Sequence, residues 1–124
     1  MIGNEERIEK NEFIEILKKR TKDGALRIIN LFQNLPKTDE ARIIGKQLLR
    51  SGTSFAANYR AVCRARSKAE FFAKLSIVVE ELDETLFWLE LLADSKIVPE
   101  NKLSQLNVEL LEILAILARA RKNT

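Results

Sequence analysis

Apolar residues recur along this chain at the three-to-four-residue spacing of amphipathic helices. Four such segments stand out, at about residues 12–34, 39–66, 68–94 and 99–121, with frayed ends at both termini. No alternating strand pattern and no hairpin dipeptide competes with them. Because only short links separate the segments, the sequence predicts an all-α fold. We expect an antiparallel up-down-up-down four-helix bundle, with residues 1–124 forming one domain.

The ends of these segments carry their own signals. Pro36 disfavours helix at the residue before it, and Thr38 or Asp39 is suited to cap the second helix. The stretch SKAE at residues 67–70 has the capping-box pattern and directly precedes an apolar run. A threonine and a glycine weaken the middle of the first segment, which favours a kink or a separate N-terminal turn at about residues 18–22.

The third segment is apolar on nearly every side, whereas a bundle helix normally keeps one polar face. We therefore expect a second subunit to cover part of it and predict a ring-shaped homo-oligomer. The alternative is a central helix in a tight monomer. The candidate interface residues combine the outward apolar side chains with two acids beside the tryptophan: Phe72, Ile77, Glu81, Glu84, Phe87, Trp88 and Leu91.

The composition bounds the class of protein. The chain has 124 residues, of which 46% are hydrophobic and 31% charged, a mixture typical of a globular domain. It contains no run of about eighteen consecutive apolar residues, so we expect no membrane span. Cys63 is the single cysteine and has no internal disulfide partner, which favours a cytoplasmic location. We interpret it as a small buried hydrophobe and not as a reactive thiol.

The absence of histidine excludes several classes of enzyme. Ferritin-like metal bundles need Glu-x-x-His pairs, and Ser-His or Cys-His nucleophile pairs need the same residue. Carboxylate-only or lysine-based chemistry stays open, but no arrangement points to it. The acids Glu80, Glu81, Asp83 and Glu84 are interpreted as solvated or arginine-paired, since no loop gathers ligands for a hard cation. We predict no enzymatic activity, no cofactor and no metal.

Charge is unevenly distributed along the chain. Residues 41–75 hold eight basic residues and one acid, whereas residues 76–100 hold seven acids and one lysine. Arg42, Lys46 and Arg50 are spaced by four and share a helix face, Arg60 and Arg64 share a face as well, and Arg66 and Lys68 lie at the corner before the third segment. Such a stripe suits contact with a phosphate backbone without sequence reading. The alternative is a solvated face, or pairing with the acids of the third segment. The candidate nucleic-acid-binding residues are Arg42, Lys46, Arg50, Arg60, Arg64, Arg66 and Lys68.

The chain also resembles a known family through a spaced motif in its central half. The motif reads Q-L-x-R-S-x-x-S-x-x-x-N, then S-x-x-E-F, then an E-x-x-E-T-x-x-W-L-like stretch, and the upstream LPKTDE matches as well. The family is named after proteins encoded in intervening sequences of 23S ribosomal RNA genes, and it includes the accessory variability protein of diversity-generating retroelements. The similarity covers about residues 20–120. The matching positions are Gln47, Leu48, Arg50, Ser51, Ser54, Asn58, Ser67, Glu70, Phe71, Glu81, Glu84, Thr85, Trp88 and Leu89.

The resemblance implies a four-helix protomer, commonly assembled as a ring of five, without known enzymatic activity. The retroelement relative is thought to bind nucleic acid and a reverse transcriptase on a basic surface. Many members carry an Ala-Glu-Gly-like triplet where this chain has Arg60, Ala61 and Val62, so this face is more basic here. We therefore expect a non-enzymatic, oligomeric accessory protein that binds RNA or DNA and pairs with a reverse transcriptase. The alternative is a homo-oligomeric scaffold in which basic and acidic segments pair across subunits.

Overall fold

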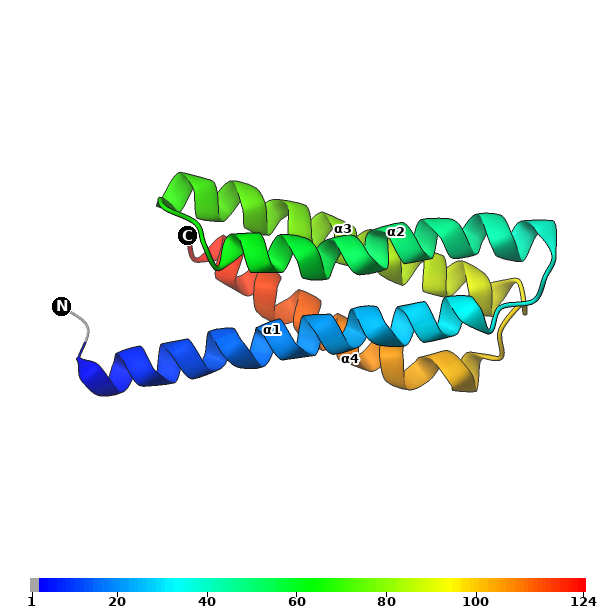
Figure 1. The fold of residues 1–124 in the computed structure, drawn as a ribbon, viewed down its shortest axis with the longest axis horizontal. Helices are drawn as coiled ribbons and strands as arrows, with labels where there is room; N and C mark the ends of the chain where they lie inside the picture. Colours follow the sequence, from blue (N-terminus) through cyan, green and yellow to red (C-terminus); the bar gives the residue numbers. More distant parts are fainter. Residues whose placement is uncertain (1–2) are drawn as a thin grey trace.

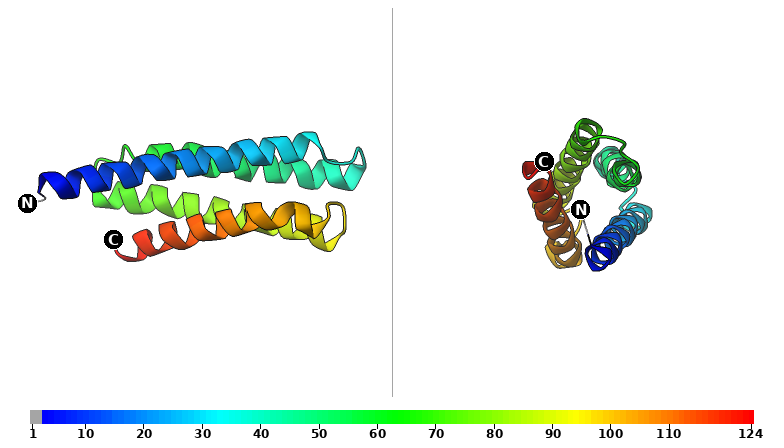
Figure 2. Two further views of the ribbon diagram at one scale, coloured as in Figure 1. Left: turned by 90° about the horizontal axis from the view of Figure 1, so that it is seen from below. Right: turned by 90° about the vertical axis from the view of Figure 1, so that its left-hand side faces the viewer.

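The computed structural model describes residues 3–124, and their side chains from residue 9 onward. These residues form four helices and no strands: α1 (Asn4–Gln33), α2 (Asp39–Val62), α3 (Lys68–Asp94) and α4 (Glu100–Lys122). Consecutive helices run in opposite directions and lie side by side (Figure 1). Seen end-on, they surround one shared core, with α4 returning beside α1 (Figure 2). The predicted all-α, four-helix fold is confirmed.

Each helix buries one apolar stripe in this core, as its spacing predicts. In α2 the stripe includes Leu48 and Phe55, both fully buried, and in α3 it includes Leu75, Leu82 and Leu89. Burying side chains of this size stabilises the fold by about 1.5–3 kcal/mol each. The edge between α1 and α4 is the loosest of the four. It is held by Arg20 of α1, which forms ion pairs with Glu109 and Glu112 of α4.

Side-chain caps fix the starts of α2 and α3. The hydroxyl of Thr38 accepts a hydrogen bond from the backbone N–H of Ala41 at 3.3 Å. The hydroxyl of Ser67 accepts one from the N–H of Glu70 at 3.1 Å. The Glu70 carboxylate in turn accepts from the N–H of Arg66 at 3.4 Å, one residue before the position that a capping box uses. Two of the helix starts are therefore set by local chemistry that the sequence displays.

The first helix differs from its expected range. It begins at Asn4, not near residue 12, and continues without a break through residues 18–22. Thr21 is fully buried there, and its hydroxyl donates to the carbonyl of Leu17 at 2.9 Å. Because the helix itself satisfies this polar group, and packing against the core favours a straight rod, the weak local propensity does not produce a kink.

The second helix ends earlier than expected, at Val62 and not at residue 66. The next residues form a tight turn, in which the N–H of Arg64 bonds to the carbonyl of Ala61 at 3.1 Å. Ser67 must then be extended to cap α3, and it has φ −151° and ψ 163°. Arg66 consequently lies in the link between α2 and α3, outside both helices.

Close packing of α1 on α2 depends on a glycine without a side chain. A Cβ added at Gly52 would lie 2.6 Å and 2.8 Å from the Cδ1 and Cγ2 atoms of Ile28. Ile28 is fully buried, and its branched side chain has little rotamer freedom in a helix. The two helices therefore approach each other at a distance that only glycine allows at this position.

We predict that Gly52→Ala destabilises the protein by about 1–3 kcal/mol, because overpacking outweighs the better helix propensity of alanine. Gly24→Ala is the matched control, since a Cβ there would meet only the flexible end of Leu110 at 3.3 Å and Phe55 at 3.4 Å. Urea unfolding followed by circular dichroism measures both variants. Equal or greater stability of Gly52→Ala would contradict this account of the α1–α2 contact.

Candidate nucleic-acid interface

The basic residues of α2 lie in three different surroundings. Arg60 and the neighbouring Arg64 line a groove that α2 forms with α1. Arg42 and Lys46 line a second hollow, at the end where α1 connects to α2. Arg50 lines neither hollow and instead pairs with two acids of α3. The spacing put Arg42, Lys46 and Arg50 on one shared face, whereas in the structure the first two line a hollow and Arg50 pairs with acids of α3.

The first of these surfaces, the α1–α2 groove, is strongly basic. It encloses about 870 Å³ and is open to solvent. Three alanines of α2 line it between the charged side chains, so no bulky group fills it. Its lining contains five cations and one acid. These residues are Glu15, Lys18, Lys19 and Lys22 from α1 with Ala56, Ala57, Arg60 and Ala61 from α2, and Arg64 in the turn after α2.

Only part of this positive charge is balanced by the protein. Lys18 pairs with Glu15 at 3.1 Å, and Lys19 pairs with Asp23 at 3.0 Å, both within α1. No ion pair among the described side chains involves Lys22, Arg60 or Arg64. Three exposed cations therefore face the groove without a protein partner, an arrangement suited to an external anion.

The second surface, the tip hollow, lies at the other end of the same helix pair. It encloses about 580 Å³ and combines an apolar lining with basic side chains. Arg42 pairs with Asp39 at 2.8 Å, but both side chains are exposed, and such pairs contribute little. The lining consists of Phe32, Gln33, Leu35, Pro36, Lys37, Ala41, Arg42 and Lys46. Of the remaining predicted residues, Arg66 and Lys68 are exposed at the α2–α3 corner and line neither hollow.

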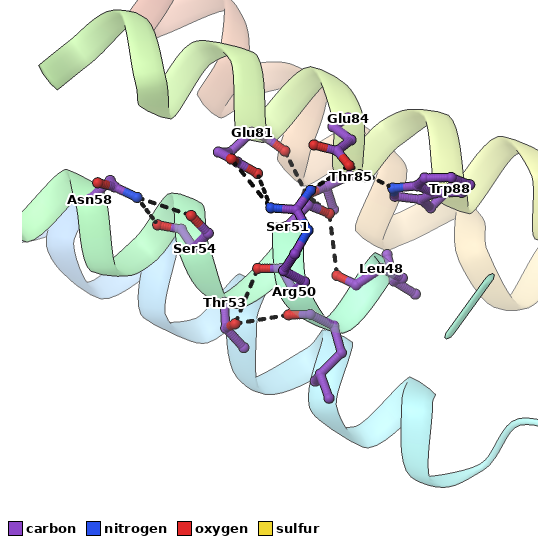
Figure 3. Close-up of polar contacts among 11 residues, drawn as sticks. Leu48, Arg50, Ser51, Thr53, Ser54, Asn58, Glu81, Glu84, Thr85 and Trp88 are labelled. Carbon is purple, nitrogen blue, oxygen red and sulfur yellow. Dashed lines mark hydrogen bonds and ion pairs between the residues drawn. The ribbon is translucent and has the colours of Figure 1, made fainter. Parts of the chain in front are cut away.

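Arg50 links α2 to α3 inside a single chain (Figure 3). Its guanidinium pairs with Glu81 at 3.3 Å and with Glu84. The indole N–H of Trp88 donates to the same Glu84 carboxylate at 3.2 Å. The Arg50 guanidinium lowers the pKa of Glu84, and its hydrogen bond to Glu84 raises the pKa of Arg50. Because two carboxylates already hold this arginine, we leave it out of the phosphate site proposed below.

Small residues let α3 pack against the same side of α2. The buried hydroxyls of Ser51 and Thr85 hydrogen-bond to each other at 2.9 Å across the two helices (Figure 3). The Asn58 amide donates to the carbonyl oxygen and to the hydroxyl of Ser54, both at 2.9 Å and within α2. The small side chain of Ser51 thus serves the packing of α2 on α3.

Some of the candidate interface residues of α3 are exposed, and others are partly buried. Phe72, Ile77 and Phe87 are 48%, 43% and 48% exposed. Trp88 is partly buried and meets Phe87 edge-on, with ring centroids 5.0 Å apart, and Leu91 is partly buried as well. On α4 the exposed apolar residues include Val108 and Leu111. Their role in assembly stays a prediction.

Tyr59 and Cys63 pack against the core beside the groove. Tyr59 is only 4% exposed, so its ring cannot act as a platform for base stacking. Cys63 is partly buried and packs on the core, and burial raises the pKa of its thiol. The neighbouring arginines therefore do not produce a reactive thiolate.

The lysines of α1 were missed by the sequence analysis. Residues 1–40 carry equal numbers of acidic and basic residues, so their net charge gave no signal. The segment KKRTK at residues 18–22 could have predicted this part of the groove. Because α1 and α2 are antiparallel and joined by a short link, this segment lies opposite the C-terminal end of α2. Arg20 of that segment turns away to α4, while Lys18 and Lys22 line the groove.

Two kinds of feature are absent from the described part of the chain. No three side chains of histidine, cysteine, aspartate or glutamate gather there as ligands for a metal ion. None of the described helices has an apolar stretch that would cross a bilayer.

Fold and surface together define a small four-helix protein with a basic groove on the outside of its first helix pair. The chain belongs to the family of 23S rRNA-intervening sequence proteins, whose model matches residues 12–119. This confirms the resemblance drawn from the motif. A comparison with curated proteins finds no match.

A solved structure agrees with this assignment. The chain is similar to a protein with unknown function from the S23 ribosomal protein family of Bacteroides thetaiotaomicron, whose crystal structure extends to 1.70 Å. The two share 35% sequence identity and superpose with a TM-score of 0.81. The similarity covers 88% of this chain and 97% of the other.

The Arg50–Glu84 pair generates a pH-dependent prediction. A carboxylate whose folded-state pKa is lowered stabilises the fold above its unfolded-state pKa, and this contribution is lost as the pH falls through the folded-state value. We therefore expect Arg50→Gln to lower the free energy of unfolding by up to about 1 kcal/mol at neutral pH. This is the range of a partly exposed ion pair. The cost should shrink as the pH falls below about 4, where glutamate protonates.

Urea unfolding at pH 7 and at pH 3 measures this difference. Lys74→Gln is the matched control, since Lys74 meets Glu70 at a looser 3.9 Å in an i,i+4 pair. The control should show little change at either pH. A loss for Arg50→Gln that is equally large at both pH values would show that the side chain acts through packing and not through charge.

Proposed function

We propose that this protein is a non-enzymatic, oligomeric nucleic-acid-binding accessory protein whose α1–α2 groove holds a phosphate backbone. One observation carries the proposal: five cations and one acid line this groove, and Lys22, Arg60 and Arg64 have no ion-pair partner among the described side chains. An exposed concave surface of one charge sign raises the local concentration of a polyanion and speeds its association.

The chemistry of the lining favours phosphate over bases. Guanidinium groups present a planar fork that matches phosphate oxygens, and lysine ammonium groups serve as mobile point charges. The lining contains no amide, hydroxyl or aromatic side chain. Contacts to phosphate position a nucleic acid but carry no sequence information. The proposed binding is therefore strongly salt-dependent and nearly independent of sequence.

The scaffold alternative has less support. It requires basic and acidic segments to satisfy each other across subunits, yet Arg50 meets Glu81 and Glu84 within its own chain. Arg60 and Arg64 line a groove with α1 whose lining includes neither of these acids. The groove cations thus have no acidic counterpart on α3 that the fold brings near them.

Self-association fits a different surface. Phe72, Ile77 and Phe87 of α3 expose apolar area, and Val108 and Leu111 do so on α4. Exposed apolar patches on soluble proteins commonly mark protein contacts. We propose that these helices meet neighbouring subunits in a ring, with five subunits as the family resemblance implies. Assembly and phosphate binding then use separate faces of the protomer.

The double variant Arg60→Gln/Arg64→Gln tests the groove. It removes two charges while keeping good helix formers. Log affinity for nucleic acid should fall with log salt, and each lost phosphate contact should make the slope shallower by about 0.9 on duplex DNA or about 0.7 on single strands. Fluorescence anisotropy titrations on two unrelated sequences measure the slopes, and both sequences should lose affinity equally.

Arg119→Gln/Lys122→Gln provides the control, since it removes two exposed charges from the end of α4, away from the groove. It should keep the wild-type slope. Light scattering should give the same particle mass for all three proteins, because Arg60 and Arg64 lie outside the apolar faces. The proposal is contradicted if wild type does not bind at low salt, or if both double variants lose affinity alike.

A further inference from the structure

Two pairs of cations with the same spacing lie along the second helix and the turn that follows it. Arg42 and Lys46 are four residues apart, and Arg60 and Arg64 repeat this spacing eighteen residues later. Eighteen residues make five full turns at 3.6 residues per turn, so side chains at this separation point in the same direction. At 1.5 Å per residue they stand about 27 Å apart along the helix. Arg64 lies in the turn directly after α2 and lines the same groove as Arg60.

The first helix and the link after it reinforce both pairs. Lys18 and Lys22 line the groove opposite Arg60 and Arg64, and we call these four residues the groove cluster. Lys37 lines the tip hollow with Arg42 and Lys46, and we call these three the tip cluster. Because α1 and α2 run side by side over this length, the two clusters lie at opposite ends of one helix pair (Figures 1 and 2).

We infer that both clusters bind one double helix laid along α1 and α2, each cluster contacting its phosphate backbone. The inference rests on the proposed function and specifies its substrate as duplex nucleic acid. At 3.4 Å of axis per base pair, a separation of about 27 Å corresponds to about eight base pairs. A duplex shorter than this reaches one cluster only, and a longer one reaches both.

The stiffness of a duplex favours it over a single strand. Its persistence length is about 50 nm, so it spans the two clusters without losing conformational freedom. It also carries one negative charge per about 1.7 Å of axis, twice the density of one strand. Proteins that bind single strands usually add aromatic platforms for the bases. The groove lining has none, and Phe32 of the tip hollow packs against the core.

The acids near the clusters do not cancel them. Glu15 is the acid that lines the groove, and it pairs with Lys18. Asp39 pairs with Arg42 beside the tip hollow. Ion pairs between exposed side chains contribute at most about 1 kcal/mol, so phosphate can replace the carboxylate in either pair. Each cluster also has at least two cations that belong to neither pair. They include Lys22 in the groove cluster and Lys46 in the tip cluster.

The experiment measures binding to hairpins with stems of 6, 8, 12 and 16 base pairs by fluorescence anisotropy. Three proteins are compared: wild type, the groove variant Arg60→Gln/Arg64→Gln and the tip variant Arg42→Gln/Lys46→Gln.

Wild-type affinity should rise steeply once the stem exceeds about eight base pairs, because the second contact becomes intramolecular. On the longest stem, either double variant should lose this rise, and its salt slope should be shallower by about 1.8. A single strand with as many phosphates as the 16-base-pair hairpin should bind at least about tenfold more weakly, since it lacks the charge density of the duplex.

The outcomes separate this inference from the function on which it rests. If the groove variant loses affinity for long stems while the tip variant binds like wild type, the groove acts alone. The proposed function then stands and the bridging inference falls. Equal or tighter binding of the single strand overturns the assignment to duplex. If wild type binds no nucleic acid at low salt, the proposed function and the bridging inference are both wrong. Arg119→Gln/Lys122→Gln should behave as wild type at every stem length.

Discussion

The contact between Ile28 and Gly52 fixes how α1 lies on α2, and the proposed site depends on it. The missing Cβ at Gly52 lets the branched side chain of Ile28 reach the α2 backbone. This sets both the distance and the register of the two antiparallel helices. Lys18 lies ten residues before Ile28, and Arg60 eight residues after Gly52, so the register brings these cations to one groove. A shift of one turn would separate them.

The second helix divides its polar residues between two neighbours. On one side, Ser51 meets Thr85 in the core, and Arg50 above it is held by Glu81 and Glu84 of α3. On the other side, the basic residues face the surface that α2 shares with α1. The acids of α3 therefore neutralise the arginine that links α2 to α3. The proposed phosphate ligand would use the remaining cations of α2.

Local chemistry made much of the fold predictable. The period of the apolar residues and the caps at Thr38 and Ser67 located the helices, because these signals act within a few residues. Thr21 and Gly24 suggested a kink that is absent, since Gly24 packs against Phe55 and Leu110 of distant segments. Tertiary packing of this kind overrides propensity and is invisible in a short window.

The site was predictable only in part, for a related reason. Spacing by four showed that Arg60 and Arg64 share a face, but it could not show which helix that face meets. Arg50 resembled them in the sequence, and its separation from them follows from the position of α3. Lys18 and Lys22 line the groove because of the register of α1 on α2. The sequence did not indicate them, since residues 1–40 have no net charge.

Lysine footprinting gives the most direct test of the claim that the α1–α2 face holds a phosphate backbone. The protein is acetylated with an amine-reactive ester at low salt, with and without a duplex of mixed sequence, and each site is quantified by mass spectrometry. We expect the duplex to protect Lys18, Lys22 and Lys46, which line the two hollows, and to leave Lys102 and Lys122 of α4 reactive. Unchanged reactivity of the groove lysines while the duplex is bound, or protection confined to α4, would contradict the account.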